Sequence, residues 1–476
     1  MKRVAPRWRH ALTRDIQEFA LLRRLLRLRP FQFLLILPTL VITVVVMISA
    51  SVGIEHPNFN FGTVFTWVVW WGGLLLSLLL IGRAWCFVCP VGALGEWIQR
   101  LSLWWPSSYP AGYNFRWPRR LRSLWLPTTL FMVFVWLDNG YGMSNSPRMT
   151  AGLVVVLALA AAWIGLLFER RAFCRYVCPL TAFIGLNSLF SMFELRQRAG
   201  DACQRCLTKD CFRGNDRYYG CPMGEFPGGG MDTNLYCILC TECVKSCPYQ
   251  NIALRFRAPG RDLWEMRRLR PDGAFAAAII VGLATVLPLL LLSLLPGLRG
   301  VLAGVLPVGD WPRLIALSLL FVAGAAMSVG LVYGFSCLSA YAAGDPAVTT
   351  RVVFASYAYS LIPIGLFKFL ADLLDHASRT WGALVDVSRA LILDFPFNRV
   401  LPGTVTVTHF LHPTGVYLLQ VGLLLCGLLF SLYATHRIAQ RLSSDSESAL
   451  ASFLPMAGLA FVLTMASLWT LGIALL

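Results

Sequence analysis

The chain has 476 residues, of which 57% are hydrophobic and only 14% are charged. About a quarter of the residues of a soluble globular protein are charged, so this composition excludes a wholly soluble protein and indicates a polytopic membrane protein. The formal net charge of +17 comes largely from arginines beside apolar segments, where basic residues set orientation and contact anionic lipid. Nucleic-acid binding is therefore not implied.

A basic segment, residues 1–30, begins the chain. Leucines oppose arginines between Arg7 and Arg29, a pattern typical of an amphipathic helix, and Pro30 ends it. The segment fits either a lipid-bound helix or a solvated flank of the first membrane span. It is too long and too charged for a secretory signal peptide, so none is expected.

Nine apolar segments follow, most of them near the length of about 20 residues that a helix needs to cross a bilayer. They are Phe33–Ser51, Val64–Ile81, Leu124–Leu137, Ala151–Phe168, Ala274–Leu295, Leu314–Tyr333, Val352–Leu374, Val416–Tyr433 and Ala449–Ala474. The third is short and is expected to extend toward Tyr141. The sequence therefore predicts an all-α polytopic membrane protein of about nine transmembrane helices, with a four-helix core (31–195), a soluble insert (196–260) and a five-helix carboxyl-terminal bundle (261–476).

Lysine and arginine are distributed unevenly between the two sides of these spans. Basic clusters precede the third span, follow the fourth and precede the fifth, all on the side of the basic amino terminus. By the positive-inside rule the amino terminus and the insert are cytoplasmic, and an odd number of helices places the carboxyl terminus outside. The predicted outer loop His376–Gly415 departs from this rule, since it contains Arg379, Arg389 and Arg399.

The first four spans contain an internal repeat. Segments Arg83–Pro90 and Arg171–Pro179 both read R-A-aromatic-C-(x2 or x3)-C-P. Two hairpins of the same orientation imply a parallel repeat, which would bring the four cysteines together at the cytoplasmic surface. These C-P pairs can be ligands of a shared third metal or cluster site, redox-active dithiols, or structural cysteines at helix ends. They are Cys86 with Cys89, and Cys174 with Cys178.

Eight of the fourteen cysteines lie between Asp201 and Asn251. The last four read C-x2-C-x2-C-x3-C-P, the spacing of a bacterial-type [4Fe–4S] site, and the first four form a looser copy, C-x2-C-x4-C-x9-C-P. In two-cluster ferredoxins the fourth cysteine of a motif binds the other cluster. One cluster is thus expected on Cys203, Cys206, Cys211 and Cys247, and the other on Cys221, Cys237, Cys240 and Cys243.

Zinc and disulfides are the alternative interpretations of these cysteines. Zinc sites usually pair two C-x2-C units from separate ribbons, which is not the spacing found here. Disulfides need an oxidising compartment, whereas the predicted topology places the insert in the cytoplasm. Iron–sulfur clusters are therefore the favoured interpretation.

Charged groups inside a membrane helix are candidates for function. Lys368, Asp372 and His376 recur every four residues in the seventh span and so share one helix face. An Asp/His pair near a membrane surface is suited to accept the protons that a quinol releases on oxidation. The alternative is an ordinary lysine–aspartate pair at a helix end.

Three histidines flank the predicted outer loop between the seventh and eighth spans. These are His376, His409 and His412. Any two of them could ligate a haem b, but no two lie in the interiors of helices that face each other. Interfacial histidines are therefore favoured over a haem site.

The C-P pairs and the ferredoxin motif resemble the membrane polyferredoxin family of quinol dehydrogenases, of the NapH, NosR and CcoG types. Cys174–Pro179 matches the family's C-x3-C-P motif, Cys86–Pro90 is one residue shorter, and Cys237–Cys247 matches its ferredoxin motif. The resemblance covers about half the chain, from Phe33 to Asn251. No flavin domain as in NosR-type proteins and no immunoglobulin-like domain as in CcoG-type proteins is expected, so the chain is most similar to a NapH-like core with an added bundle.

This resemblance implies quinol oxidation in the bacterial cytoplasmic (inner) membrane, with electrons relayed through two [4Fe–4S] clusters. The partner would be a redox subunit such as a cytochrome c, a flavoprotein or a soluble ferredoxin-like protein. Two other functions remain open: an assembly factor that reduces copper or thiols, as the CcoG resemblance allows, and a membrane anchor that docks soluble electron carriers.

Overall fold

The computed structural model describes residues 15–28, 30–104, 112–198, 200–305, 309–345, 348–396, 411–443 and 445–473. The chain divides into two compact units. Unit 1 comprises Met1–Val44, Leu76–Leu126 and Val154–Arg268. Unit 2 comprises Val45–Leu75, Pro127–Leu153 and Leu269–Leu476. The finer division into segments 1–30, 31–195, 196–260 and 261–476 stays a prediction.

Eight helical segments of the described residues are long and apolar enough to cross a membrane. They are α3 (Phe31–Val52), Phe61–Leu80, α9 (Pro147–Leu167), α15 (Pro271–Val305), α16 (Trp311–Ala343), Thr350–Leu393, α19 (Pro413–Leu442) and α20 (Ser446–Ile473). The third predicted span is α8 (Trp125–Tyr141), which has 17 residues and extends to Tyr141 as expected. The fold class, an all-α polytopic membrane protein, is confirmed.

Two of these spans are composite. Phe61–Leu80 begins as α4 (Phe61–Val64), continues through a π-helical stretch (Phe65–Trp70) and ends as α5 (Trp71–Leu80). Thr350–Leu393 consists of α17 (Thr350–Ser360) and α18 (Ile362–Leu393).

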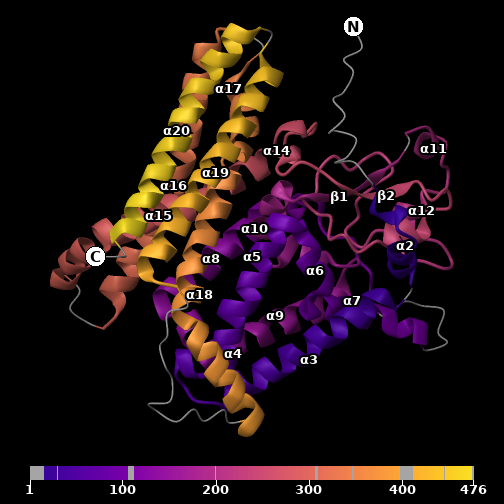
Figure 1. The fold of residues 1–476 in the computed structure, drawn as a ribbon, viewed down its shortest axis with the longest axis horizontal. Helices are drawn as coiled ribbons and strands as arrows, with labels where there is room; N and C mark the ends of the chain where they lie inside the picture. Colours follow the sequence, from indigo (N-terminus) through magenta and orange to yellow (C-terminus); the bar gives the residue numbers. More distant parts are fainter. Residues whose placement is uncertain are drawn as a thin grey trace. The chain divides into compact units, whose positions relative to one another are not determined.

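Unit 2 is built around the carboxyl-terminal helices. Helix α15 packs against α16, α18 packs against α19, and α20 contacts both α16 and α19 (Figure 1). Small residues allow this close packing, as is usual between membrane helices. A Cβ added at Gly282 of α15 would lie 1.9 Å from the hydroxyl oxygen of Ser328 on α16, so these two helices meet without room for a side chain.

The predicted outer loop His376–Gly415 is wrong over its first part, because α18 continues as a helix to Leu393. The apolar run ends near Leu374, but an amphipathic helix follows it. An ion pair of 3.0 Å joins Asp375 to Arg379 on its polar side. Val387 is fully buried in a core with Val46, Phe61, Val64 and Val68. Beyond Leu374, α18 thus keeps apolar residues at helical spacing on one face, although its mean hydropathy falls.

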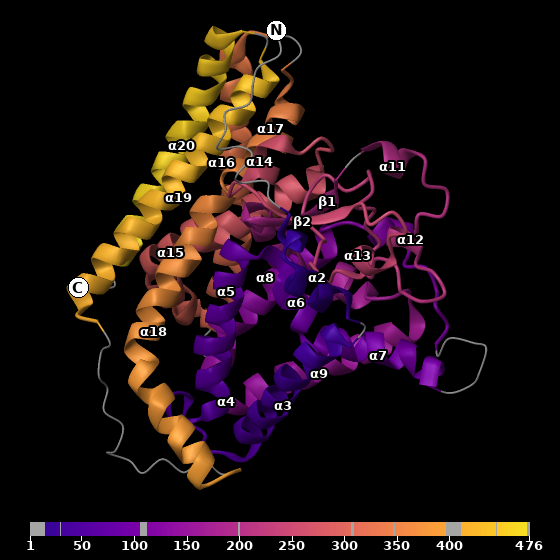
Figure 2. The same ribbon diagram turned by 45° about the vertical axis from the view of Figure 1, so that its right-hand side comes forward.

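The cysteine-rich insert of unit 1 is closed by a two-stranded antiparallel sheet. Strand β1 (Phe193–Gln197) precedes the first of its cysteines and β2 (Ile252–Phe256) follows the last, with Phe193 paired to Phe256 and Gln197 to Ile252. The eight cysteines therefore lie between the two paired strands, on loops and short helices that Figure 2 shows beside β1 and β2. These helices are α11 (Gly200–Gln204), α12 (Asp210–Arg213) and α13 (Glu242–Ser246); α14 (Arg261–Glu265) follows β2.

The basic amino-terminal segment packs on the insert. Its described part forms α2 (Ala20–Arg27), shorter than the predicted helix, whose residues up to 14 lie outside the described residues. The hydroxyl of Thr241 donates to the carbonyl oxygen of Leu26 at 3.1 Å, and Arg27 donates to the side chain of Gln250 at 3.0 Å. Leu26 is buried, so protein contacts account for this turn of the segment.

Candidate functional site

The two C-P motifs end helical hairpins in the same way but with different turns. In the first copy α6 (Trp85–Val88) leads to Cys89, and Pro90 begins α7 (Pro90–Trp104). In the second copy Phe173–Val177 is π-helical, with the Cys178 N–H bonded to the Phe173 carbonyl at 2.8 Å, and α10 (Leu180–Asn187) follows. A π turn contains one extra residue. The π turn therefore accommodates the third residue between Cys174 and Cys178, where the first copy has two residues between its cysteines.

The two copies hold each other through matching arginines. Arg83 of the first copy donates from Nη2 to the backbone carbonyl of Cys174 at 2.6 Å. Arg171 of the second copy donates from Nη1 to the backbone carbonyl of Cys86 at 2.9 Å. Both arginines are buried, with 1% and 4% of their surface exposed. The repeat thus forms a reciprocal pair of contacts, each between an arginine and the first cysteine of the other copy.

A buried carboxylate on α7 neutralises this arginine cluster. Glu96 is 2% exposed and accepts from Arg170 at 2.8 Å and from Arg171 at 2.8 Å. Removing either partner of such a buried pair leaves an uncompensated charge, which costs about 3–5 kcal/mol. The Nη2 nitrogen of Arg171 has no hydrogen-bond partner within the described chain. Arg171 therefore keeps one unused donor beside the thiols.

Close approach of α7 to α9 brings Glu96 to these arginines. A Cβ added at Gly95 would lie 2.6 Å from the backbone oxygen of Ala161, and one at Gly165 would lie 2.7 Å from Gly95. The side chain of Gln99 also donates to the backbone oxygens of Gly165 and Phe168 at 2.8 and 2.6 Å. Glycine is required at this crossing because no side chain fits between the backbones.

The four C-P thiols are neighbours, as the repeat predicts. The pKa of Cys174 is raised to about 12, chiefly by burial; Arg171 opposes this rise, whereas Cys86 and Cys89 contribute to it. Burial also raises the pKa of Cys178, with further contributions from Cys174, Cys86 and Cys89. Within the described residues, however, no three of these or other His, Cys, Asp or Glu side chains are placed to hold one metal ion. A third metal site therefore stays a prediction.

Three more contacts bind the insert to the C-P hairpins. The Nη1 nitrogen of Arg83 donates to the Leu235 carbonyl at 3.0 Å, just before Cys237. Arg170 donates to the Gly220 carbonyl at 3.1 Å, just before Cys221. A Cβ at Gly224 would lie 2.8 Å from the guanidinium of Arg175, so the insert backbone lies directly on this arginine. These contacts fix the loops that carry one of the two predicted cysteine sets.

That set, which we call the inner set, consists of Cys221, Cys237, Cys240 and Cys243. The last three are buried, and burial raises the pKa of Cys240 to about 12 and that of Cys237 to about 11. After burial, Cys221 is the largest contributor to the raised pKa of Cys240, whereas Arg171 opposes the rise. Burial likewise raises the pKa of Cys243, with contributions from Cys240, Cys221 and Cys237. The inner set is thus one group of mutually close sulfurs beside Arg171.

The outer set consists of Cys203, Cys206, Cys211 and Cys247. All four line one hollow, together with Asn251 and other residues of the insert. The side chain of Asn251 donates to the sulfur of Cys203 at 3.1 Å, and its backbone N–H donates to that of Cys247 at 3.3 Å. The Lys209 N–H donates to the sulfur of Cys206 at 3.4 Å. Such N–H donors stabilise thiolate ligands and tune cluster potentials.

Left-handed backbone conformations place several of these donors. Lys209, Leu239, Thr241 and Gln250 are not glycines, yet all have φ between 50° and 62°. Each lies within two or three residues of a cluster cysteine, and conformations of this kind cost about 1–3 kcal/mol. These loops therefore adopt costly backbone conformations at the residues next to the cysteines, which positions the sulfurs at the expense of local stability.

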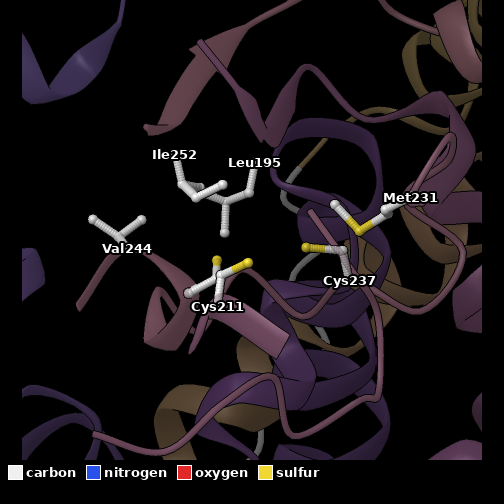
Figure 3. Close-up of a cluster of buried hydrophobic side chains, with 7 residues drawn as sticks. Leu195, Cys211, Met231, Cys237, Val244 and Ile252 are labelled. Atoms are coloured by element: carbon white, nitrogen blue, oxygen red, sulfur yellow. The ribbon is translucent and has the colours of Figure 1, made fainter. Parts of the chain in front are cut away.

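The chemistry of this donor set fits iron–sulfur clusters. All fourteen cysteines are free thiols. A cuboidal cluster takes one thiolate at each of four irons, so its ligands need not meet at a single ion, as zinc ligands do. Figure 3 shows Cys211 of the outer set and Cys237 of the inner set against the same apolar core, formed by Leu195, Met231, Val244 and Ile252. Burial in such a core is a further factor that sets a cluster potential.

The candidate proton and haem residues lie in unit 2. Lys368 is buried, and its Nζ lies 2.5 Å from Oδ1 of Asp372, while Asp372 and His376 are exposed on α18. His412 caps α19, where its Nδ1 accepts from the Thr414 N–H at 3.3 Å. His409 lies outside the described residues. The lysine–aspartate pair is therefore present as expected, and the proton and haem roles stay predictions.

Sequence reasoning missed the arginine network. Arg83 and Arg171 were noted as the first residues of the repeat motif and Arg170 and Arg171 as positive-inside residues, but no contact was expected of them, and Glu96 was not singled out. The available signal was the arginine at the same position of both repeat copies, because a residue that only sets orientation does not need a fixed place in a motif.

Comparison with known proteins supports this picture. A 4Fe-4S binding domain family matches residues 63–108 and 150–193, and each matched segment contains one C-P pair. Together with the eight cysteines of the insert, these two matches confirm the prediction of two [4Fe–4S] clusters. No solved structure matches the chain.

Several curated relatives match part of the chain. The protein NirI of Paracoccus denitrificans (strain Pd 1222) is 30% identical over 224 residues, which are 40% of this chain and 30% of the relative. YccM of Escherichia coli (strain K12) is 27% identical over 199 residues, which are 37% of this chain and 51% of the relative. The methylamine utilization ferredoxin-type protein MauN of Paracoccus denitrificans is 30% identical over 146 residues, 28% of this chain and 50% of the relative.

The chain thus spans about a third to a half of these relatives' length. The repeat, the cysteine insert, the membrane helices and these matches agree. The chain is a multi-pass membrane protein that contains matches to a 4Fe-4S binding domain family, and over part of its length it is similar to ferredoxin-type and electron transport proteins.

Proposed function

We propose that the chain oxidises membrane quinol, or exchanges electrons with the quinone pool, and relays electrons through the inner set and then the outer set to a partner redox protein. In this proposal the eight insert cysteines hold the two clusters in the crossed arrangement. Each cluster supplies one-electron chemistry, and the chain's residues fix its place, its burial and its hydrogen bonds.

The observation that carries the proposal is the difference in surroundings between the two sets. The inner set is attached to the C-P hairpins through Arg83 and Arg170, and three of its cysteines are buried. In the outer set only Cys211 is buried. The two sets are also neighbours, since Cys211 packs in one buried cluster with Cys237 and Cys243. This arrangement supports a path from the membrane hairpins through the inner set to the surface.

We place the amino terminus and the insert in the cytoplasm and the carboxyl terminus outside a bacterial inner membrane. Support comes from basic residues that flank the spans on the insert side, such as the exposed Arg119, Arg120, Arg267 and Arg268. Such clusters favour the cytoplasmic side. We further propose that Lys368, Asp372 and His376 bind the quinol head group or accept its protons.

The test uses protein purified without oxygen in nanodiscs. We expect about eight irons and about eight acid-labile sulfides per chain, and two interacting cluster signals in the electron paramagnetic resonance (EPR) spectrum after reduction with dithionite. A menaquinol analogue should produce the same signals at a potential set by the quinol/quinone ratio. Zinc in place of iron would overturn the relay, whereas clusters that respond to dithionite and not to any quinol would overturn only the quinol step.

The C-P thiols favour a second function, metalloenzyme assembly. A pair of neighbouring cysteines supplies the soft thiolate ligands that copper(I) prefers, and copper binding would deprotonate these buried thiols. Serine at Cys86 and Cys174 would then leave the quinol-driven signals unchanged and abolish metal delivery to a partner oxidase. Loss of the quinol-driven signals in the same variant would favour the relay instead.

A further inference from the structure

The outer set opens at an exposed face of the insert. Its hollow is lined by Cys203, Cys206, Cys211 and Cys247 together with Tyr249 and other residues. Three of these cysteines are half-buried rather than buried. Electron exchange with another protein requires the two cofactors to come close, so the face over this hollow is the place where the outer set is accessible.

Large apolar side chains are exposed around this hollow. Leu207 is 90% exposed, Tyr249 is 59% exposed and Phe212 is 41% exposed. Leu207 directly follows Cys206, Phe212 directly follows Cys211, and Tyr249 is two residues beyond Cys247. Scattered apolar side chains are normal on a protein surface, but three that are adjacent to ligands of one site indicate a contact area.

Exposed charges in the insert segment 201–217, which carries three of the outer cysteines, are mainly positive, although the half-buried Asp210 lines the hollow itself. Four basic residues of the loop and of helices α11 and α12 are exposed, against two exposed acidic residues. The basic residues are Arg205, Lys209, Arg213 and Arg217, and the acidic ones are Asp201 and Asp216. An apolar centre with a charged border suits a transient redox complex, because the charges steer the encounter and the apolar contact is small enough to release quickly.

We propose that this face docks an acidic, soluble one-electron carrier protein whose own cofactor lies near its surface. The inference rests on the proposed function and adds the site of exchange and the charge of the partner. Each encounter moves one electron: the outer site loses it and the carrier gains it, or the reverse. No bond forms or breaks and no proton is needed. A basic carrier such as a cytochrome c is disfavoured at this face by like-charge repulsion.

The experiment measures binding and electron exchange separately on the full-length protein in neutral-lipid nanodiscs. The probes are an acidic [2Fe–2S] ferredoxin and a basic cytochrome c. Binding is followed by biolayer interferometry between 20 and 300 mM salt, and exchange by anaerobic stopped-flow absorbance. We expect the ferredoxin to bind the wild type more tightly at low salt and to lose affinity steeply as salt rises. We expect weaker binding of the cytochrome c.

Two sets of variants test the location. The double variant Arg205→Glu with Arg213→Glu should weaken ferredoxin binding and slow exchange by about tenfold or more at low salt, with little change at 300 mM. The matched variant Asp201→Asn with Asp216→Asn, in the same segment of the insert, should strengthen both. Unchanged ferredoxin binding in the first variant, or tighter binding of the cytochrome c by the wild type, would overturn the proposal.

The EPR spectrum after dithionite reduction distinguishes a failure of the docking proposal from a failure of the proposed electron relay. Intact signals in the arginine double variant show that the outer site is still loaded, so a changed affinity reports docking. Intact signals with no binding of the ferredoxin by the wild type overturn the docking face alone. Absence of cluster signals in the wild type overturns the proposed relay and this inference with it.

Discussion

Arg83 donates a hydrogen bond of 2.6 Å to the backbone carbonyl of Cys174, across the boundary between the two repeat copies. Its counterpart Arg171 returns the contact to Cys86. Each copy therefore positions the first cysteine of the other. Arg83 also bonds the Leu235 carbonyl, so one guanidinium joins both C-P motifs to the loop that carries the inner set.

Replacement of Arg83 by glutamine should destabilise unit 1 by about 3 kcal/mol, because the buried carbonyls of Cys174 and Leu235 lose a charged donor. Arg83→Lys should recover only part of this loss, since an ammonium cannot reproduce the planar fork. Thermal unfolding of the detergent-solubilised protein measures the effect. The matched control is Arg120→Gln at an exposed site. Equal stabilities of the two glutamine variants would contradict the prediction.

Replacement of Glu96 by glutamine should raise the midpoint potential of the inner cluster. The carboxylate neutralises Arg170 and Arg171, and Arg171 acts electrostatically on Cys240. Loss of this negative charge makes the inner cluster easier to reduce. By Coulomb's law at an effective dielectric constant of about 20, its midpoint potential should rise by several tens of millivolts. An EPR-monitored redox titration gives both potentials. The outer cluster is the internal control, and Glu265→Gln, at an exposed ion pair, should move neither.

Serine in place of one cysteine from each set should remove different clusters. Cys240→Ser is expected to eliminate the inner signal and Cys206→Ser the outer one, each lowering iron from about eight to about four per chain. The crossed arrangement is tested by Cys247→Ser, which should remove the outer signal although Cys247 ends the motif of the inner cysteines. If Cys247→Ser removed the inner signal instead, the crossed assignment would be wrong.

Alanine at Gly95 should destabilise the crossing of α7 and α9. The new methyl group would lie 2.6 Å from the backbone oxygen of Ala161, so the helices must separate at a cost of about 1–3 kcal/mol. Glu96 would then move away from its arginines. The control is Gly152→Ala on α9, where a Cβ meets nothing within 4 Å. Thermal unfolding should separate the two variants, and a control as unstable as Gly95→Ala would refute the steric argument.

Asparagine at Asp372 should slow reduction of the clusters by quinol and leave their reduction by dithionite unchanged. The change removes the carboxylate that pairs with the buried Lys368 and a candidate proton acceptor. Stopped-flow EPR with a menaquinol analogue measures the rate. Asp375→Asn, one turn away and paired with Arg379, is the control, and equal effects of both changes would remove Asp372 from the quinol site.

The sequence predicted the membrane spans and the grouping of the eight cysteines, because both depend on local patterns. A bilayer fixes the length of an apolar run, and cluster geometry fixes the spacing of thiolates on a short loop. Cys247 lines the same hollow as Cys203, Cys206 and Cys211, and the crossed assignment of ligands stays a prediction.

The arginine network and the continuation of α18 were not predicted, for a common reason. Charged residues beside a span have one average role, orientation, and their individual partners depend on contacts distant in sequence. Arg171 and Glu96 are 75 positions apart. Asp375, Arg379 and Asp386 lower the hydropathy of α18 after Leu374, but Val387 on its other face still packs in a core. Hydropathy averages both faces of a helix and so ended the span too early.

The π-helical turn at Phe173–Val177 also bears on how such chains are detected. One copy has two residues between its cysteines and the other has three. Pro90 nevertheless begins α7 and Pro179 directly precedes α10, and each arginine still bonds the first cysteine of the other copy. A pattern search with a fixed number of residues between the two cysteines would therefore find only one of the two copies. A search that tolerates a one-residue insertion, anchored on the arginine and the proline, would recover both halves.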